Sequence, residues 1–391
     1  MNDLQRFKAI CRGEQTDFVP IIGLPGASGL AFGGAWGQVY QRLIETGMPP
    51  SVKPWTTQTQ WHPDAAKSWS DYWGTLTPLT IDFWPCQPPP GIESKKTIDG
   101  NHEIIEYNTG AVTRQLINND DAYSMPEFRT HHIRDRQSFH FYKKLNTPGP
   151  LWPDEKIELA CKPYENRDKP LFISLLSTWG ALRDLAGPEK ACTILYDDPA
   201  LAHEIIDFQT SLRRQYLFPL VKRLKPEIIQ LTEDCCYKQG MLISPAHFDE
   251  FCRPAYEEIV RLAQQCQTDV IAVDTDGNIA EFLPLLEDLG VNATYPVEAK
   301  AGNDLLTLRK NHPEFIFFGG LEKETINQGN EHTIENEISS KVPPMLKKGR
   351  YFPNIDHSLQ PMCTFQNLLK FMKLLHEVTN NPLGRFYNDC P

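Results

Sequence analysis

The chain has 391 residues, a hydrophobic content of 40% and a formal net charge of −11. Its length fits two or three typical domains or one large barrel, and its acidic balance argues against nucleic acid as a partner, because binding to phosphates needs a basic surface. No apolar run approaches the roughly 20 residues of a membrane span, and the N-terminus lacks the basic-then-apolar pattern of a secretory signal, so we expect a soluble cytoplasmic protein.

The N-terminal part of the chain predicts a helix, a strand and then a segment of different texture. Helical spacing over residues 4–12 is followed by the apolar run 18–22, which is typical of a buried strand. Between about residues 55 and 136, aromatic residues and prolines crowd together. The alternating runs 102–107 and 111–114 in this segment indicate a β-hairpin. We interpret the segment as an N-terminal aromatic and β-hairpin insertion in one domain that spans the whole chain, residues 1–391.

From residue 170 onward, short apolar runs alternate with segments of helical spacing. The apolar runs are residues 171–176, 228–231, 270–273, 291–295, 315–318 and 351–352. Such alternation is typical of βαβ units and a parallel sheet. Together with the first apolar run there are at least seven strands, which favours an α/β fold of the closed (β/α)8 TIM-barrel type. No glycine-rich nucleotide-binding motif follows any of these runs.

Polar residues follow the predicted strands, where a TIM barrel has its active site. Carboxylates, a histidine or bare glycine backbone stand at five strand ends, in the groups Glu233-Asp234, Asp274 with Asp276 and Asn278, Glu298, Gly319-Gly320, and Asp356-His357. Because parallel strands of a barrel end at one face, we predict that these residues share one mouth. Asp274 is the hardest to explain structurally, since a carboxylate beside a buried strand is costly unless it is paired.

Each of these groups also has a structural alternative. Glu233-Asp234 can cap a helix, Asp276-Gly277-Asn278 can form a turn, and Asp356-His357 can be a structural hydrogen bond. Taken together, the carboxylates and His357 form an acidic cluster. Such a cluster suits a divalent metal, a cationic ligand, or a carboxyl group of raised pKa that delivers protons.

The motifs at these strand ends resemble those of the uroporphyrinogen decarboxylase (URO-D) superfamily. The segments that carry the resemblance are residues 6–20, 233–240 with Lys238, 242–245, 274–278, Gly319-Gly320 with Lys323, and 354–358. The superfamily has a (β/α)8 barrel and contains both porphyrinogen decarboxylases and corrinoid-dependent methyltransferases. The resemblance therefore implies the fold but leaves the reaction open.

Two departures from the family patterns bear on the reaction. The decarboxylases carry an Arg-Gln-Ala-Gly-Arg motif after the first strand, whereas residues 24–30 here contain no arginine. The methyltransferases hold zinc with a His-x-Cys pair and a later cysteine. Here Asp274-x-Asp276 stands at the pair, and Ile355 or Asp356 lies near the later cysteine. The resemblance thus implies an oxygen- and nitrogen-rich zinc site made of Asp274, Asp276 and His357.

We predict a methyltransferase-like enzyme that moves a methyl group from a small methylated substrate to a corrinoid carried by a separate protein. One alternative is a cofactor-free decarboxylase of uroporphyrinogen or a smaller carboxylic acid, and another is a non-catalytic ligand-binding barrel. Nucleic acid and membranes are not expected partners, and a homodimer stays open. The expected catalytic residues are Asp274, His357, Glu233 and Asp234. The expected substrate-binding residues are Asp276, Asn278, Glu298, Lys238, Gly319, Gly320 and Asp356.

Overall fold

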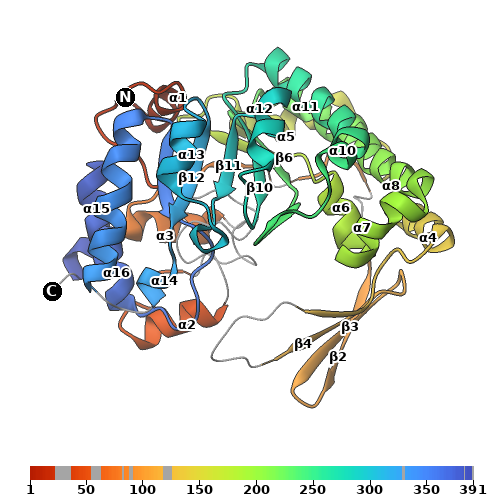
Figure 1. The fold of residues 1–391 in the computed structure, drawn as a ribbon, viewed down its shortest axis with the longest axis horizontal. Coiled ribbons are helices and arrows are strands. Elements are labelled where there is room, and N and C mark those ends of the chain that lie inside the picture. The colour runs from red at the N-terminus through yellow and green to blue at the C-terminus, as the bar shows by residue number, and fades with distance from the viewer. Residues whose placement is uncertain are drawn as a thin grey trace.

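A curled parallel sheet with helices on its outer face forms the centre of the computed structural model (Figure 1). The structure describes residues 1–22, 37–53, 63–81, 83–87, 91–117, 126–327, 331–382 and 384–389. Within these ranges, seven strands pair in the order β1-β6-β7-β10-β11-β12-β13. Their bounds are β1 (Leu79–Thr80), β6 (Leu171–Ser174), β7 (Ile228–Thr232), β10 (Val270–Thr275), β11 (Ala293–Pro296), β12 (Ile316–Leu321) and β13 (Tyr351–Ile355).

The predicted first strand connects the two edges of this sheet. Ile22 forms a parallel bridge with Leu76, just before β1, and the side-chain amide of Asn354 on β13 donates to the carbonyl of Ile22 over 2.9 Å. The segment makes a single bridge rather than a ladder, in keeping with Pro20, which lacks an N–H group to donate. The TIM-barrel fold predicted from the sequence is confirmed.

Helices follow the strands and cover the outside of the sheet. Their bounds are α1 (Asp3–Cys11), α2 (Gly37–Glu45), α3 (Pro63–Trp73), α4 (Arg136–Asn146), α5 (Asp154–Cys161), α6 (Trp179–Ala186), α7 (Pro188–Asp197), α8 (Pro199–Leu212), α9 (Phe218–Leu224), α10 (Pro245–His247), α11 (Arg253–Cys266), α12 (Phe282–Leu289), α13 (Leu305–Asn311), α14 (Glu324–Asn327), α15 (Glu331–Lys348) and α16 (Phe365–Thr379). None of the helices in the described ranges combines the length and the apolar character that a bilayer crossing requires.

Alternation along the strands separates an inner core from an outer one. On β10, Val270 and Ala272 belong to the inner core, whereas Ile271 and Val273 pack in the outer core between sheet and helices. Helix α1 contributes Phe7 to the inner core and so lies across the end of the barrel opposite the mouth. Because side chains alternate along a strand, a residue two places beyond Ala272 also faces the interior.

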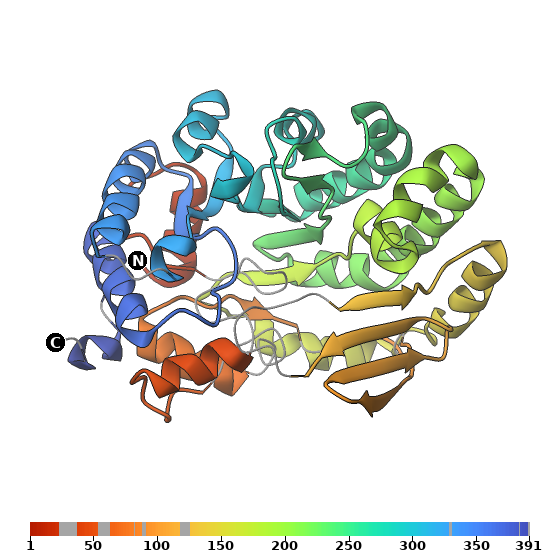
Figure 2. The same ribbon diagram turned by 60° about the horizontal axis from the view of Figure 1, so that its bottom comes forward.

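A separate antiparallel sheet stands beside the barrel, as Figures 1 and 2 show. Its strands pair in the order β2 (Ser94–Asp99), β3 (His102–Tyr107), β4 (Val112–Leu116) and β5 (Glu127–Thr130). The predicted hairpin is confirmed as β3 and β4, with Gly110 of the turn at a φ of +85°. That this segment is an insertion in the family's barrel, and that the chain is one domain, both stay predictions.

Candidate functional site

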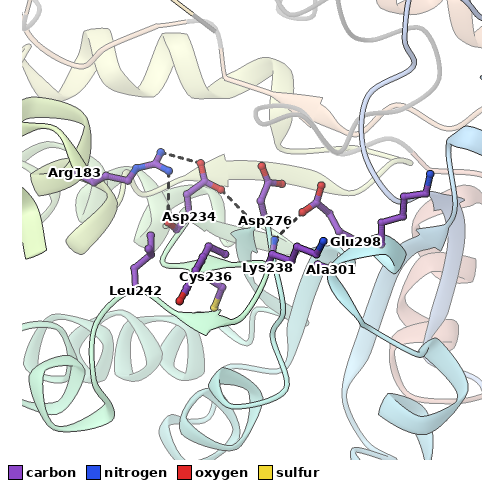
Figure 3. Close-up of a pocket in the computed structure, with 11 residues that line it drawn as sticks. Arg183, Asp234, Cys236, Lys238, Leu242, Asp276, Glu298 and Ala301 are labelled. Carbon is purple, nitrogen blue, oxygen red and sulfur yellow. Dashed lines mark hydrogen bonds and ion pairs between the residues drawn. The ribbon is translucent and has the colours of Figure 1, made fainter. Parts of the chain in front are cut away.

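The carboxyl ends of β7, β10 and β11 and the loops after them surround a pocket of about 510 Å3 (Figure 3). Much of the wall is charged: its carboxylates are Asp234, Asp276 and Glu298, and its cationic side chains are Arg183, Lys238 and Lys300. The sequence alone indicated an acidic cluster. The structure adds Arg183 and Lys300, because α6 and the loop after β11 also reach the mouth. It places Lys238, which was expected to bind substrate, in the hairpin of β8 (Cys236–Tyr237) with β9 (Gly240–Met241).

Asp234 connects α6 to the loop after β10. Its carboxylate accepts a hydrogen bond from the guanidinium of Arg183 over 2.8 Å and another from the backbone N–H of Asp276 over 3.2 Å. Figure 3 shows Arg183 and Asp234 pointing toward one another. Burial raises the pKa of Asp234, the neighbouring Asp276 raises it further, and Arg183 opposes the rise. Asp234 therefore lines the pocket but is already paired with Arg183.

Asp276, Glu298 and His357 come together from three strand ends. Nε2 of His357 lies 3.4 Å from Oδ2 of Asp276, and each of the three residues offers one ligand atom within 4.8 Å of the others. Oδ1 of Asp276 and Nδ1 of His357 are buried, and no described residue bonds either atom. Two carboxylates and one imidazole are a ligand set that zinc and related divalent ions accept.

This group differs in one member from the metal ligands expected from the sequence. Asp274 lies outside it, and Glu298, which was expected to bind substrate, takes part instead. The reason lies in the course of the chain: β10 ends at Thr275, and Gly277 has a φ of +84°. The backbone turns there, so Asp276 reaches the rim while Asp274 remains inside β10.

Asp274 is fully buried, and no described residue hydrogen-bonds either of its carboxylate oxygens. Burial raises the pKa of Asp274 well above its ordinary value, and the nearby carboxylates of Asp234 and Asp276 raise it further. A buried carboxyl group without partners is costly and therefore uncommon outside functional sites. The expected catalytic role of Asp274 stays a prediction, and its position restricts that role to chemistry inside the barrel.

Glu233 makes structural contacts at the start of α6. Its carboxylate accepts hydrogen bonds from the backbone N–H groups of Thr178 and Gly180, over 2.8 and 2.9 Å. Burial raises the pKa of Glu233, and these two bonds together with Arg213 oppose the rise. These contacts are those of a helix-capping residue, which was the structural alternative for Glu233. The capped helix is α6, which comes before β7 in the chain and not after it. A catalytic role for Glu233 stays a prediction.

Asp356 and Asn278 hold loops of the rim. Asp356 accepts hydrogen bonds from the backbone N–H groups of Ala299 and Lys323, over 2.8 and 2.9 Å. Burial raises the pKa of Asp356 to about 6. Asn278 donates from its side chain to the carbonyl of Ala301 over 3.0 Å. Both residues shape the backbone of the rim in which Glu298 and Lys300 stand.

The two glycines expected to offer bare backbone lie inside β12. Gly319 has a φ of +96°, and a Cβ atom built on it would collide with the carbonyl oxygen of Pro296. Gly320 has a φ of +83° and packs against Leu305. Their backbone conformation and close packing account for glycine at both positions. The expected substrate contact of either residue stays a prediction.

Sequence reasoning missed Arg183, Lys300 and Tyr237 of the pocket wall. Arg183 lies on α6, away from any strand end, so position along the chain offered no signal for it. Lys300 follows Glu298 by two residues and could have been found by extending the search along that loop. Residues 24–30, where the arginine motif of the decarboxylases would stand, lie outside the described residues.

Comparisons with known proteins agree with this architecture. A solved structure of a methyltransferase from Methanosarcina mazei superposes with a TM-score of 0.57 over 97% of this chain and 98% of that chain, at 14% sequence identity. At this identity the likeness shows a shared fold. None of the curated protein sequences matches the chain. The family profile described as Uroporphyrinogen decarboxylase (URO-D) matches residues 154–378, which is more than half of the sequence. The chain therefore belongs to the uroporphyrinogen decarboxylase family.

Proposed function

We propose that the protein is a methyltransferase that moves a methyl group from a small methylated substrate to a corrinoid carried by a separate protein. The observation that carries this proposal is the group of Asp276, Glu298 and His357 at the barrel mouth. It stands close to where the resemblance to the methyltransferase branch places metal ligands. The shared fold with the Methanosarcina mazei methyltransferase supports the same assignment.

The residues present fit a divalent ion. Oδ1 of Asp276 and Nδ1 of His357 have no partner among the described residues, so each of these side chains has coordination capacity left. Asp276, Glu298 and His357 would hold the ion. When bound, such an ion supplies Lewis-acid polarisation of the heteroatom that carries the methyl group.

The chain's own residues orient the ligands and the substrate. The backbone N–H of Gly277 donates to Oε2 of Glu298 over 2.8 Å, which fixes this carboxylate beside Asp276. Arg183 holds Asp234, so that carboxylate is neutralised at the pocket wall. Lys238 then provides positive charge at the rim for an anionic part of the substrate or of the partner protein, whereas Lys300 already pairs with Glu322 and Glu324.

Decarboxylation of a carboxylic acid is the second candidate, and Lys238 of the pocket wall favours it. This cation offers charge complementarity to a carboxylate substrate, whereas Arg183 and Lys300 are already paired with carboxylates of the protein. Residues 24–30, however, supply none of the arginines that the family's decarboxylases use. A porphyrinogen with eight carboxylates would therefore meet much less positive charge than in those enzymes.

Metal analysis tests the metal part of the proposal. We expect the wild type to retain about one zinc ion per chain after dialysis, and Asp276→Ala and His357→Ala to lose it. His203→Ala, an exposed histidine on α8, is the matched control and should retain zinc. Equal zinc content in all four proteins would contradict the assignment of the ligands.

Turnover separates the two reactions. Methylation of free cob(I)alamin, followed by its absorbance change with a panel of methoxylated and N-methylated compounds, should occur with the wild type and fail with His357→Ala. Formation of coproporphyrinogen from uroporphyrinogen by the pure protein, without cobalamin methylation by any compound, would favour the decarboxylase instead.

A further inference from the structure

Three neighbouring strands carry buried polar side chains into the barrel beneath the mouth. Gln230 on β7 and Asp274 on β10 have no exposed surface, and Tyr295 on β11 has 2%. No described residue hydrogen-bonds Oε1 of Gln230 or either carboxylate oxygen of Asp274. The hydroxyl of Tyr295 lies beside the side chain of Gln230, which opposes the rise that burial causes in the pKa of Tyr295.

The register of the strands brings these side chains together. Asp274 stands opposite Tyr295 on β11 and opposite Thr232 on β7. The side-chain amide of Gln230 donates to the hydroxyl of Thr232 over 3.1 Å. The three polar side chains therefore occupy adjacent positions of one curved wall.

All three side chains face the interior. Tyr295 belongs to the inner core, and Gln230 and Asp274 follow the inner-core residues Ile228 and Ala272 by two positions. Because side chains alternate along a strand, these positions point the same way. Gln230 stands opposite Ala272, and Asp274 and Tyr295 lie one inward-facing position nearer the rim that holds Asp276.

The fold pairs its other buried carboxylates near the mouth. Glu233 and Asp356 each accept two backbone N–H groups. Asp274 has no such donors among the described residues, although it is buried as deeply as Glu233. Packing alone can account for a single unpartnered atom, but three unpartnered oxygens on two adjacent strands, beside the buried hydroxyl of Tyr295, together indicate a ligand.

The charges around Asp274 select the kind of ligand. The carboxylates of Asp234 and Asp276 lie close enough to act on Asp274, and Arg183 is held by Asp234. A second carboxylate placed here would face like charge in a buried setting, where repulsion is strong. A neutral or cationic group with N–H or O–H donors would instead satisfy the unpartnered oxygens.

We propose that Gln230, Asp274 and Tyr295 form an interior subsite that binds the hydrogen-bond-donating end of the substrate, an N–H or O–H group of neutral or positive charge. The inference rests on the proposed function for the reacting end, which would lie at Asp276, Glu298 and His357. The expected substrate is therefore a small methylated compound with a hydrogen-bond donor at its inner end and no carboxylate there.

Binding of small probes to the metal-free protein tests the subsite. Ethylammonium chloride, acetamide and sodium acetate are compared by saturation-transfer NMR. Ethylammonium and acetamide should bind and compete with one another, and acetate should not compete. Asp274→Asn should weaken binding of ethylammonium and acetamide by about tenfold, because it replaces a carboxyl oxygen that accepts with an NH2 group that opposes the N–H donors of the probes. Tyr295→Phe should weaken acetamide and ethylammonium by a few-fold, in line with the loss of one hydrogen bond (roughly 1 kcal/mol).

The matched control is Asp288→Asn, which changes an exposed carboxylate on α12 and should bind the probes like the wild type. Near-UV circular dichroism checks that each variant is folded, and Tyr295→Phe serves if Asp274→Asn is not. Acetate that binds as tightly as ethylammonium, or variants of the subsite that bind like the wild type, would overturn the proposal. The probes need no metal and no methyl transfer, so failure of the subsite and failure of the proposed function are separate results.

Discussion

Two buried carboxylates at opposite ends of the barrel, Glu227 and Asp274, differ in their partners. At the base, Glu227 accepts hydrogen bonds from Arg167 over 2.8 and 2.9 Å and from the backbone N–H of Leu171 over 2.9 Å. Lys8 of α1 lies 3.3 Å from the same carboxylate. At the mouth, Asp274 is equally buried, and no described residue bonds it. Burial alone therefore does not define a role: the contacts of Glu227 stabilise the fold, whereas the unpartnered oxygens of Asp274 are those that we propose bind a ligand.

The largest expected effect is a loss of stability when the contacts of Glu227 at the base are removed. Arg167→Met should lower the free energy of unfolding by about 3 kcal/mol, since it removes one partner of a buried ion pair and leaves Glu227 short of donors. Urea denaturation measures it. Arg223→Met, which removes an exposed ion pair with Glu165, should cost less than about 1 kcal/mol. Equal losses in the two variants would show that the base network does not stabilise the fold as proposed.

At the mouth, substitution of Asp274 should change the free energy of unfolding in the opposite direction. Asp274→Asn should leave the protein folded and raise the free energy of unfolding by about 1 kcal/mol at pH 7, because it removes an ionisable group that is buried without a partner. The same urea denaturation measures the change. A loss of stability as large as that of Arg167→Met would mean that Asp274 serves the fold, and the contrast between the two ends would disappear.

A smaller effect on stability, which depends on pH, is expected at Asp17, which pairs with Arg6 of α1. Asp17 accepts two hydrogen bonds from the guanidinium of Arg6, which lower the pKa of Asp17 from its usual 3.8 to about 2. The folded pKa lies below the unfolded one, so the ionised form stabilises the fold above about pH 4, and this contribution is lost as the pH falls toward 2. Asp17→Asn should therefore melt slightly below the wild type at pH 7.

The two melting temperatures should converge between about pH 4 and pH 2, as thermal scans across that range would record. The effect is small because more than half of the Asp17 side chain is exposed. A gap that stays constant down to pH 2 would mean that the pair with Arg6 does not set the pKa of Asp17.

The strands of the barrel could be predicted from the sequence because buried parallel strands are continuous apolar runs. The runs 228–231 and 270–273 lie within β7 and β10. Strand β1 was missed, since Leu79–Thr80 is too short to form such a run. The end of β10 was placed too early, because the strand continues through the polar residue Asp274.

The location of the site could be predicted from the sequence, but the role of each residue could not. Glu233 and Asp234 are neighbours in the sequence, yet one accepts backbone N–H groups of α6 and the other, with a φ of +46°, turns to Arg183. Both are acidic residues directly after the same strand, so only the backbone around them separates a capping residue from a pocket residue. The same limit explains why Glu298 rather than Asp274 joins Asp276 and His357.

The contacts of Asp356 bear on how this barrel can change its chemistry. From the end of β13, one carboxylate holds the backbone after β11 at Ala299 and the backbone after β12 at Lys323. The anchoring bonds end on main-chain N–H groups, so the side chains of the two loops are free to vary while the loops keep their places. Substitution at Lys300 or Lys323 can therefore alter what the mouth recognises with little movement of its frame. Directed evolution toward new substrates should begin at these two positions and keep Asp356 unchanged.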